Sequence, residues 1–139
     1  MSLIDTLSVA SSGLSAQRVR LQTVSSNIAN AESVDAQGNP YQRKVVNLSS
    51  QSTDPFGDAL SQAIQHVSID GVESREDFLE VLDWNSPFAD ENGMVRKPNI
   101  NPMTEMVDMM SASRSYEANS TVIDATRDLV NRAISLGRS

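Results

Sequence analysis

The 139-residue chain contains no cysteine and only one histidine, His66. The lack of cysteine excludes thiol nucleophiles, disulfides, cysteine-ligated zinc and iron–sulfur clusters. Aromatic residues are also scarce, with one Trp, two Tyr and three Phe, which is few for a compact core. No apolar run approaches the ~20 residues that cross a bilayer. The N-terminus has neither the basic start nor the apolar stretch of a secretory signal. We therefore expect neither a membrane span nor a cleaved signal peptide.

Basic residues are outnumbered by acidic ones, 11 against 18, and the formal net charge is -7. Such a chain lacks the basic face that a nucleic-acid binder needs, so we expect no nucleic-acid partner. The acidic excess lies between residues 51 and 100, which carry a net charge of -7, whereas residues 1–50 carry +1 and residues 101–139 carry -1. The charge thus divides the chain into two nearly neutral ends and an acidic middle.

The N-terminal end predicts a helix of about 29 residues. Its apolar residues alternate between spacings of four and three, as in a coiled-coil seam, and Gln17 is the one polar member. Ser2 is expected to cap the helix, with Asp5 three residues later. Because the other positions are rich in serine and include Gly13, the helix needs packing partners to be stable. The seam consists of Leu3, Leu7, Ala10, Leu14, Gln17, Leu21, Val24, Ile28 and Ala31.

The C-terminal end predicts a second helix, of about 34 residues. Asn101 suits the N-cap, Pro102 the first helical position and Gly137 the end. One row on its face consists of Ala112, Tyr116, Asn119, Ile123, Thr126, Val130 and Ala133. A second row consists of Ala118, Val122, Ala125, Leu129, Arg132 and Leu136. A methionine-rich patch near the start, which we interpret as adaptable packing and not as a ligand site, comprises Met103, Met106, Val107, Met109 and Met110.

The two helices are too long for a compact domain. At 1.5 Å per residue they measure ~44 and ~51 Å, whereas a globule of this size has a radius of gyration of ~14 Å. We therefore predict a mainly α fold, in which the long N- and C-terminal helices pair as an elongated coiled-coil-like hairpin around a small β-rich insertion. Residues 1–32 and 101–139 would form an inner assembly domain, and residues 33–100 an extended loop and a small acidic outer domain. Two helices leave much of a wide apolar stripe uncovered, which indicates assembly with other chains.

The middle of the chain predicts turns and short strands. Turn signals occur at 38–40, where Gly, Asn and Pro follow one another, and at 90–93. Extended segments are expected at 41–48, 67–72, 78–82 and 94–97. A helical spacing predicts one or two turns over Leu60, Ala63, Ile64 and Val67.

Catalytic and metal-binding patterns are weak. His66 has no Ser or Asp partner at a recognisable spacing, which favours a surface or packing role. Residues 83–94 have the character of a calcium loop, but the sixth residue is Phe88 in place of Gly and the twelfth is Met94 in place of Glu. We therefore expect no enzymatic activity, no cofactor and no metal site. A solvated acidic face is expected from Asp70, Glu73, Glu76, Asp77 and Glu80.

Motifs at the two ends indicate a family. Residues 11–21 read Ser-Ser-Gly-Leu-Ser-Ala-Gln-Arg-Val-Arg-Leu, residues 25–31 read Ser-Ser-Asn-Ile-Ala-Asn-Ala, and residues 113–119 read Ser-Arg-Ser-Tyr-Glu-Ala-Asn. The first two motifs resemble the N-terminal signature of the flagellar axial proteins of rod and hook, and the third resembles their C-terminal signature. Residues 38–44 and 89–109 are similar to members found in the proximal rod. The resemblance covers 10–47 and 87–137, close to two-thirds of the chain.

The resemblance implies a structural subunit of the proximal rod, which is the drive shaft of the bacterial flagellar basal body. In this family the terminal helices of neighbouring subunits stack into a helical tube that transmits torque and encloses the export channel. The implied partners are copies of the chain itself, other rod subunits, rod-base and export-gate proteins, and the flagellar type III export apparatus. The implied location is the basal body, in the rod that spans the periplasm, after export without a cleaved signal peptide.

The resemblance also implies an assembly interface on the terminal helices. Asn27 and Asn30 would make amide hydrogen bonds between helices. Gln17 and Asn119 would fix the register as polar groups within apolar seams. The expected interface comprises Leu3, Leu7, Leu14, Gln17, Leu21, Val24, Asn27, Ile28, Asn30, Met106, Met110, Tyr116, Glu117, Asn119, Val122, Ile123, Ala125, Leu129 and Val130.

Three alternatives stay open from the sequence. The chain could be another rod subunit of the same family. A coiled-coil adaptor or export chaperone would share the seams and the acidity, but not the paired terminal motifs. A small hydrolase or metal-binding protein would require a divalent-ion site between Asp83 and Glu91.

Overall fold

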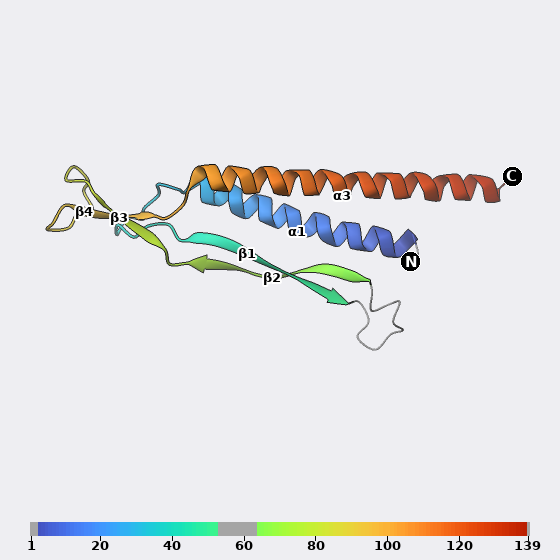
Figure 1. Ribbon diagram of the computed structural model, residues 1–139, viewed down its shortest axis with the longest axis horizontal. Coiled ribbons are helices and arrows are strands. Elements are labelled where there is room, and N and C mark those ends of the chain that lie inside the picture. Colours follow the sequence, from blue (N-terminus) through green and yellow to red (C-terminus); the bar gives the residue numbers. More distant parts are fainter. Residues whose placement is uncertain (1–2, 53–63, 139) are drawn as a thin grey trace.

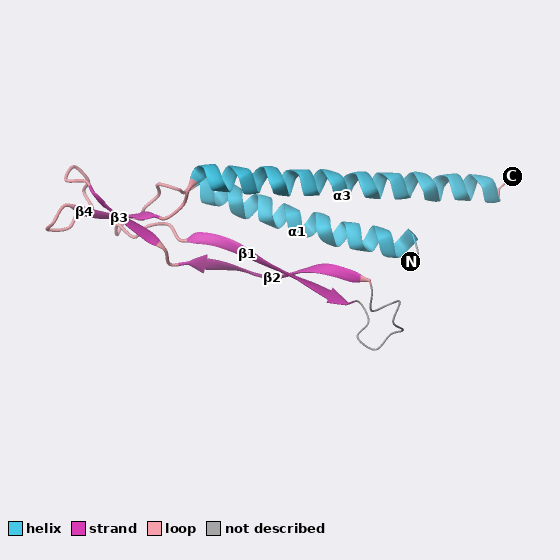
Figure 2. Ribbon diagram, in the orientation of Figure 1, coloured by secondary structure: helices cyan, strands magenta, loops and turns pink. Residues whose placement is uncertain are grey.

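The computed structural model describes residues 3–52 and 64–138. Within them the chain forms two long helices and four strands (Figures 1 and 2). The helices are α1 (Leu3–Ala29) and α3 (Pro102–Gly137), and the strands are β1 (Arg43–Ser52), β2 (Gln65–Arg75), β3 (Phe78–Leu82) and β4 (Met94–Pro98).

Helices α1 and α3 lie side by side and run antiparallel, so that both termini are at the same end of the molecule (Figure 1). Asn101 caps α3 as predicted, because its side chain accepts hydrogen bonds from the main-chain N–H groups of Met103 and Thr104 and Pro102 follows it. Helix α3 has 36 residues against 27 in α1, and its last turns extend past the start of α1.

The four strands form two separate antiparallel ribbons. In the β1–β2 ribbon, Arg43 pairs with Arg75 and Ser52 pairs with Gln65, with a bulge between Asn47 and Leu48. This ribbon runs along α1, and the main-chain N–H of Val67 donates a 3.2 Å hydrogen bond to Ser12 Oγ. The β3–β4 ribbon lies beyond the helices, at the end opposite the termini (Figure 2).

The prediction of a mainly α fold built on a coiled-coil-like hairpin is wrong. A small β insertion does lie between the helices, but its strands of 10, 11, 5 and 5 residues make up a large part of the fold. The paired helices also lack the expected seam, since most of the large apolar seam residues of α1 are only half-buried and small residues lie at the contact. Heptad spacing identifies an apolar stripe but does not identify which neighbour covers it.

The apolar core of the described chain is small. Its buried apolar side chains are Ala10, Ala16, Val24, Val95, Ile100 and Ala112. The molecule exposes 9576 Å², whereas a compact monomer of the same mass would expose about 7,100 Å². The chain is therefore elongated, as the lengths of the two helices predicted.

The strand and turn predictions are largely confirmed. The expected strand 78–82 matches β3, and β1, β2 and β4 overlap the other three expected segments. Gly38 and Gly93 both adopt positive φ angles, of 84° and 76°, within the predicted turns. The predicted helical turns are wrong at Ile64 and Val67, because Ile64 is irregular and Val67 belongs to β2. Leu60 and Ala63, like the expected N-cap Ser2, lie outside the described residues.

Candidate functional site

The two helices approach closely through small residues. Ala10, Gly13 and Ala16 are buried on α1, and Ala112 is buried on α3. A Cβ atom added to Gly13 would lie 2.7 Å from Nδ2 of Asn119, so Asn119 lies directly against the α1 backbone. This contact fixes how far apart the helices sit and where along α1 Asn119 lies.

Arg43, Asn27 and Glu105 form a polar junction where α1, α3 and β1 meet. Glu105 is 1% exposed, and its Oε1 accepts hydrogen bonds from Arg43 Nε at 2.8 Å and Nη2 at 2.6 Å. Its Oε2 accepts a 3.0 Å hydrogen bond from Asn27 Nδ2. Both carboxylate oxygens of this buried group are thus satisfied, which the burial of a charge requires.

Asn27 also connects the polar junction to β1. Its side-chain amide forms two hydrogen bonds with the main chain of Lys44, as a neighbouring strand would. Its Nδ2 donates to the carbonyl oxygen of Lys44 at 2.8 Å, and its Oδ1 accepts from the Lys44 N–H at 2.9 Å. The Tyr41 hydroxyl also donates to Asn27 Oδ1 at 3.3 Å, and it lies 3.1 Å from Ser26 Oγ. One side chain therefore links both helices to the start of the β1–β2 ribbon.

Sequence reasoning missed the polar junction as a unit. Glu105 was recognisable only as an acidic residue in the first turn of a helix, and Arg43 only as part of a turn-strand motif. Arg43 and Glu105 are 62 positions apart, so spacing alone could not pair them. Asn30, which was grouped with Asn27, donates its side-chain N–H to the Ser26 carbonyl within α1.

The predicted interface residues of α1 are mostly half-buried. Val24 is buried against the rest of the chain, whereas Leu3 is exposed. Gln17 Oε1 is buried and has no hydrogen-bond partner among the described residues. The residues left half-buried, and so able to contact another chain, are Leu7, Leu14, Leu21 and Ile28.

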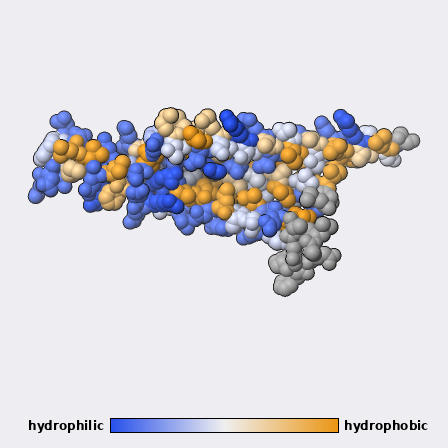
Figure 3. All heavy atoms as spheres, viewed as in Figure 1, coloured by the Kyte–Doolittle hydropathy of each residue, from blue (hydrophilic) through white to orange (hydrophobic). Residues whose placement is uncertain are grey.

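The predicted interface residues of α3 fall into two groups. Asn119, Ile123 and Val130 are half-buried in the row that faces α1. The others are exposed and include Met106, Met110, Tyr116, Glu117, Val122, Ala125 and Leu129, of which Leu129 is 56% exposed. On the face shown in Figure 3, apolar residues gather along the helical pair and again at the β3–β4 end. The expectation that the methionine-rich patch packs within the chain is wrong, because Met103, Met106 and Met110 are all exposed.

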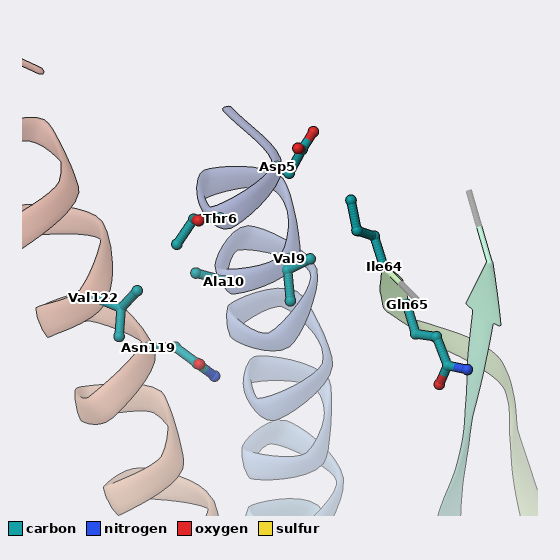
Figure 4. Close-up of a pocket in the computed structure, with 8 residues that line it drawn as sticks. All are labelled: Asp5, Thr6, Val9, Ala10, Ile64, Gln65, Asn119 and Val122. Atoms are coloured by element: carbon teal, nitrogen blue, oxygen red, sulfur yellow. The ribbon is translucent and has the colours of Figure 1, made fainter. Parts of the chain in front are cut away.

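A hollow of about 340 Å³ lies between α1, α3 and the segment that leads into β2 (Figure 4). Its α3 wall is formed by Asn119 and Val122, and its β2 wall by Ile64 and Gln65. The α1 wall consists of Asp5, Thr6, Val9 and Ala10. The mixed lining has no cluster of charged groups that would act on a substrate, and Val122 is open to solvent beside it.

The acidic groups of the middle segment serve turns. Asp83 Oδ1 accepts a hydrogen bond from the Asn85 N–H, and Asp90 Oδ1 accepts hydrogen bonds from the N–H groups of Asn92 and Met94. Within residues 3–52 and 64–138, no three His, Asp or Glu side chains are grouped to hold a metal ion. Neither described helix combines the length and apolarity needed to cross a membrane. His66 lies in β2, opposite Gln51 of β1.

Family models match the two ends of the chain, and curated relatives match nearly its whole length. Residues 7–35 match the family described as flagella basal body rod protein, and residues 91–136 match the family described as flagellar basal body rod FlgEFG protein C-terminal. Among curated proteins, the chain is 46% identical to the flagellar basal-body rod protein FlgC of Agrobacterium fabrum, over 92% of this chain and 90% of the relative. It is 38% identical to FlgC of Bacillus subtilis, over 99% and 100%, and 37% identical to FlgC of Salmonella typhimurium, over 99% and 100%.

Proposed function

The chain belongs to the FlgC family of flagellar basal-body rod proteins and is a structural subunit of the rod, and we propose that it assembles through the exposed faces of α1 and α3. The assembly would join copies of this chain to one another and to other rod subunits. Its buried polar junction would keep the two helices and the β1–β2 ribbon in a fixed arrangement while further subunits join the rod.

The observation that carries this proposal is the exposed apolar row along α3. Val122 and Leu129 lie on the row that flanks the buried row, where they are 42% and 56% exposed, and Tyr116 of the buried row is also more than a third exposed. The core of the described chain is small, and residues 3–52 and 64–138 leave this row substantially open to solvent. Burial of such a row between subunits removes apolar area from water, at about 25 cal/mol for each Å².

The proposed role extends to the proximal part of the rod. The paired helices of many copies would stack into a tube that transmits torque and encloses the export channel, with the acidic middle segment in the outer layer. The nearly neutral charge of the two terminal segments supports this arrangement, because many copies can pack side by side without repelling one another. The acidic residues of the middle segment would lie on the outside, where water and salt screen their charges. Rod-base proteins and the export gate would contact the first copies.

The location in the rod follows from the family, and the route there is part of the proposal. We propose export by the flagellar type III apparatus without a cleaved signal peptide, into the rod where it spans the periplasm. Cell-envelope fractions from strains with and without a working export apparatus test this route. The chain is expected in basal bodies only in the first strain, and its presence in the second would contradict the route.

A substitution on the exposed row tests the assembly surface. Leu129→Asp places a charge where a neighbouring subunit would bury apolar area, so incorporation into isolated basal bodies should fall at least about tenfold. Because Leu129 is 56% exposed, the helical circular dichroism of the purified chain should not change.

Asn131→Asp is the matched control, since it adds the same carboxylate to an exposed position of the same helix, off this row. It should leave incorporation unchanged. Equal incorporation of the Leu129→Asp variant and the unmodified chain would contradict the proposed surface.

A further inference from the structure

The loop between β3 and β4 carries a rigidly held, exposed tryptophan. Trp84 is 67% exposed, although an ideal Cβ on Gly93 would come within 2.5 Å of two atoms of its indole ring. The ring therefore lies flat on the Gly93 backbone, which only a residue without a side chain permits at a φ of 76°. One face of the indole is thereby fixed, and the outer face is open to solvent.

Hydrogen bonds hold the loop around Trp84 in one conformation. The Asp83 N–H donates to the Gly93 carbonyl at 2.8 Å, which closes the loop at its base. Asp90 Oδ1 accepts from the main-chain N–H groups of Asn92 and Met94, each at 2.8 Å. A rigid aromatic side chain loses little conformational entropy on binding, and tryptophan is enriched among the residues that dominate interface energies.

Two apolar neighbours and an acidic rim accompany this indole. Leu82 is 61% exposed, and Phe88, whose ring lies against Gly38, is also exposed; we call the exposed apolar residues Leu82, Trp84 and Phe88 of this end of the molecule the tip patch. Three acidic residues and no basic residue occur between Leu82 and Met94, namely Asp83, Asp90 and Glu91. An apolar anchor with an acidic rim is complementary to an apolar hollow beside a basic group. The same rim disfavours an anionic lipid surface.

The first turns of α3 present a surface of this kind. A hollow of about 300 Å³ is lined by Val107, Met110, Ser111, Arg114 and Ser115, which we call the α3 hollow. Met110 is 54% exposed, and methionine adapts its shape to irregular partners. The described residues place no acidic group within ion-pair distance of Arg114, whose guanidinium can stack on an indole or pair with a carboxylate.

We propose that the tip patch of one copy docks into the α3 hollow of a neighbouring copy. A chain cannot reach its own hollow, because the β3–β4 ribbon points away from the helices beyond the start of α3 (Figure 1). The contact joins two different surfaces, so it propagates from copy to copy and does not stop at a dimer. This inference rests on the proposed function. In addition to the packing of helices between subunits, it assigns a second intersubunit contact to the acidic middle segment.

The absence of cysteine allows a direct test by crosslinking. A chain with Leu82→Cys and Met110→Cys, expressed in flagellated cells, is recovered in isolated basal bodies and treated with a short thiol-reactive crosslinker. We expect covalent dimers and longer chains in which mass spectrometry joins position 82 to position 110. The control pair is Leu82→Cys with Asp128→Cys, which lies 18 residues or ~27 Å further along α3 and should give no crosslink.

The outcomes separate this contact from the proposed function. Incorporation of the double variant without an 82–110 crosslink overturns the tip contact and leaves the rod assignment standing. Crosslinks from position 82 only to a different rod protein also overturn it. Absence of the unmodified chain from basal bodies overturns the proposed function itself.

A charge exchange covers the case in which the cysteine variants do not incorporate. Arg114→Glu places a negative charge beside the acidic rim and should lower incorporation about tenfold. Glu91→Arg in the same chain places a positive charge at position 91 opposite the carboxylate introduced at position 114, lowers the net negative charge of the tip from -3 to -1, and should restore incorporation toward the unmodified level. A double variant as defective as Arg114→Glu alone overturns the contact, and circular dichroism confirms that both chains are folded.

Discussion

At the scale of single residues, the polar junction concentrates more interactions than any other described part of the chain. Glu105 is buried among three elements that come from distant parts of the sequence, and Arg43 and Asn27 satisfy both of its oxygens. Removal of one partner from a buried ion pair costs more than the pair itself contributes, because the other charge stays buried and uncompensated.

Arg43→Ala tests this asymmetry. It should lower the free energy of unfolding by about 3 kcal/mol, since it leaves the Glu105 carboxylate unpaired in the interior. Urea unfolding followed by circular dichroism measures the change. Arg96→Ala is the control, because its pair with Glu80 is 3.8 Å long and exposed, and it should cost less than about 1 kcal/mol. Equal losses in the two variants would contradict a special role for the polar junction.

Gln17 presents the opposite situation, a buried side-chain oxygen that finds no hydrogen-bond partner in the described part of the chain. Gln17→Leu should leave the stability of the chain unchanged or raise it by about 1 kcal/mol, because it removes an unsatisfied polar atom. If the amide fixes the register between subunits, the variant should also build less uniform assemblies, which electron microscopy of isolated rods measures. Uniform rods and full motility would contradict the register role.

Hydrogen bonds within a turn lower the pKa of the Asp35 carboxyl. The Asn39 side chain donates a 3.0 Å hydrogen bond to Asp35 Oδ2 and, together with main-chain N–H donors, lowers the pKa of this exposed carboxyl below its ordinary value. The turn is therefore stabilised above the ordinary pKa, and this contribution is lost as the pH falls through the lowered pKa. Asn39→Ala should raise the pKa, as measured by NMR titration of the carboxyl carbon. An unchanged titration would show that the Asn39 side chain is not the main cause.

At the scale of elements, close packing of the helices depends on one glycine. Gly13→Leu should destabilise the chain by about 1–3 kcal/mol, because its side chain meets Asn119 and forces α1 and α3 apart. Thermal unfolding by circular dichroism measures the loss. Ser11→Leu adds the same side chain at an exposed position of α1 and should be nearly neutral. If both variants unfold at the same temperature, Gly13 does not set the helix separation.

The elements themselves could be predicted largely from local sequence. Asn101 and Pro102 marked the start of α3, and extended segments next to turn residues located β3 and β4 within about one residue. The packing could not be predicted in the same way. The large apolar residues Leu7, Leu14 and Leu21 follow the heptad spacing of α1. The close contact with α3 is nevertheless made by small residues such as Ala10 and Gly13. Which face of an amphipathic helix is covered depends on neighbours far along the chain.

The candidate site could be predicted only in part from the sequence. The exposed row with Val122 and Leu129 was identified from helical spacing. Spacing could not show that Asn27 bonds to β1 and α3 together, because those partners are 17 and 78 positions away. The tip patch was missed because an exposed tryptophan in a turn-rich segment has no periodic signal.

At the scale of the whole molecule, the end of α3 is the part with least internal support. Every described residue from 131 to 138 is exposed, and α1 does not extend alongside this segment (Figure 1). A helix end that lacks tertiary packing is marginal in water. The amides of this segment should therefore exchange with solvent rapidly in the purified monomer and slowly in assembled rods, as hydrogen exchange with mass spectrometry measures. Strong protection in a dilute monomer would contradict the view that assembly orders this end.

Because both termini lie at one end, the molecule should resist forces differently according to the direction in which they act. A pull that separates the two termini would open the antiparallel helices from that end, so their contacts would break one turn after another. A load along the common axis would slide one helix past the other, so that the Gly13 contact and the polar junction would resist together. The subunit should thus be weak against peeling and strong against shear, the loading that a twisted shaft imposes along its wall.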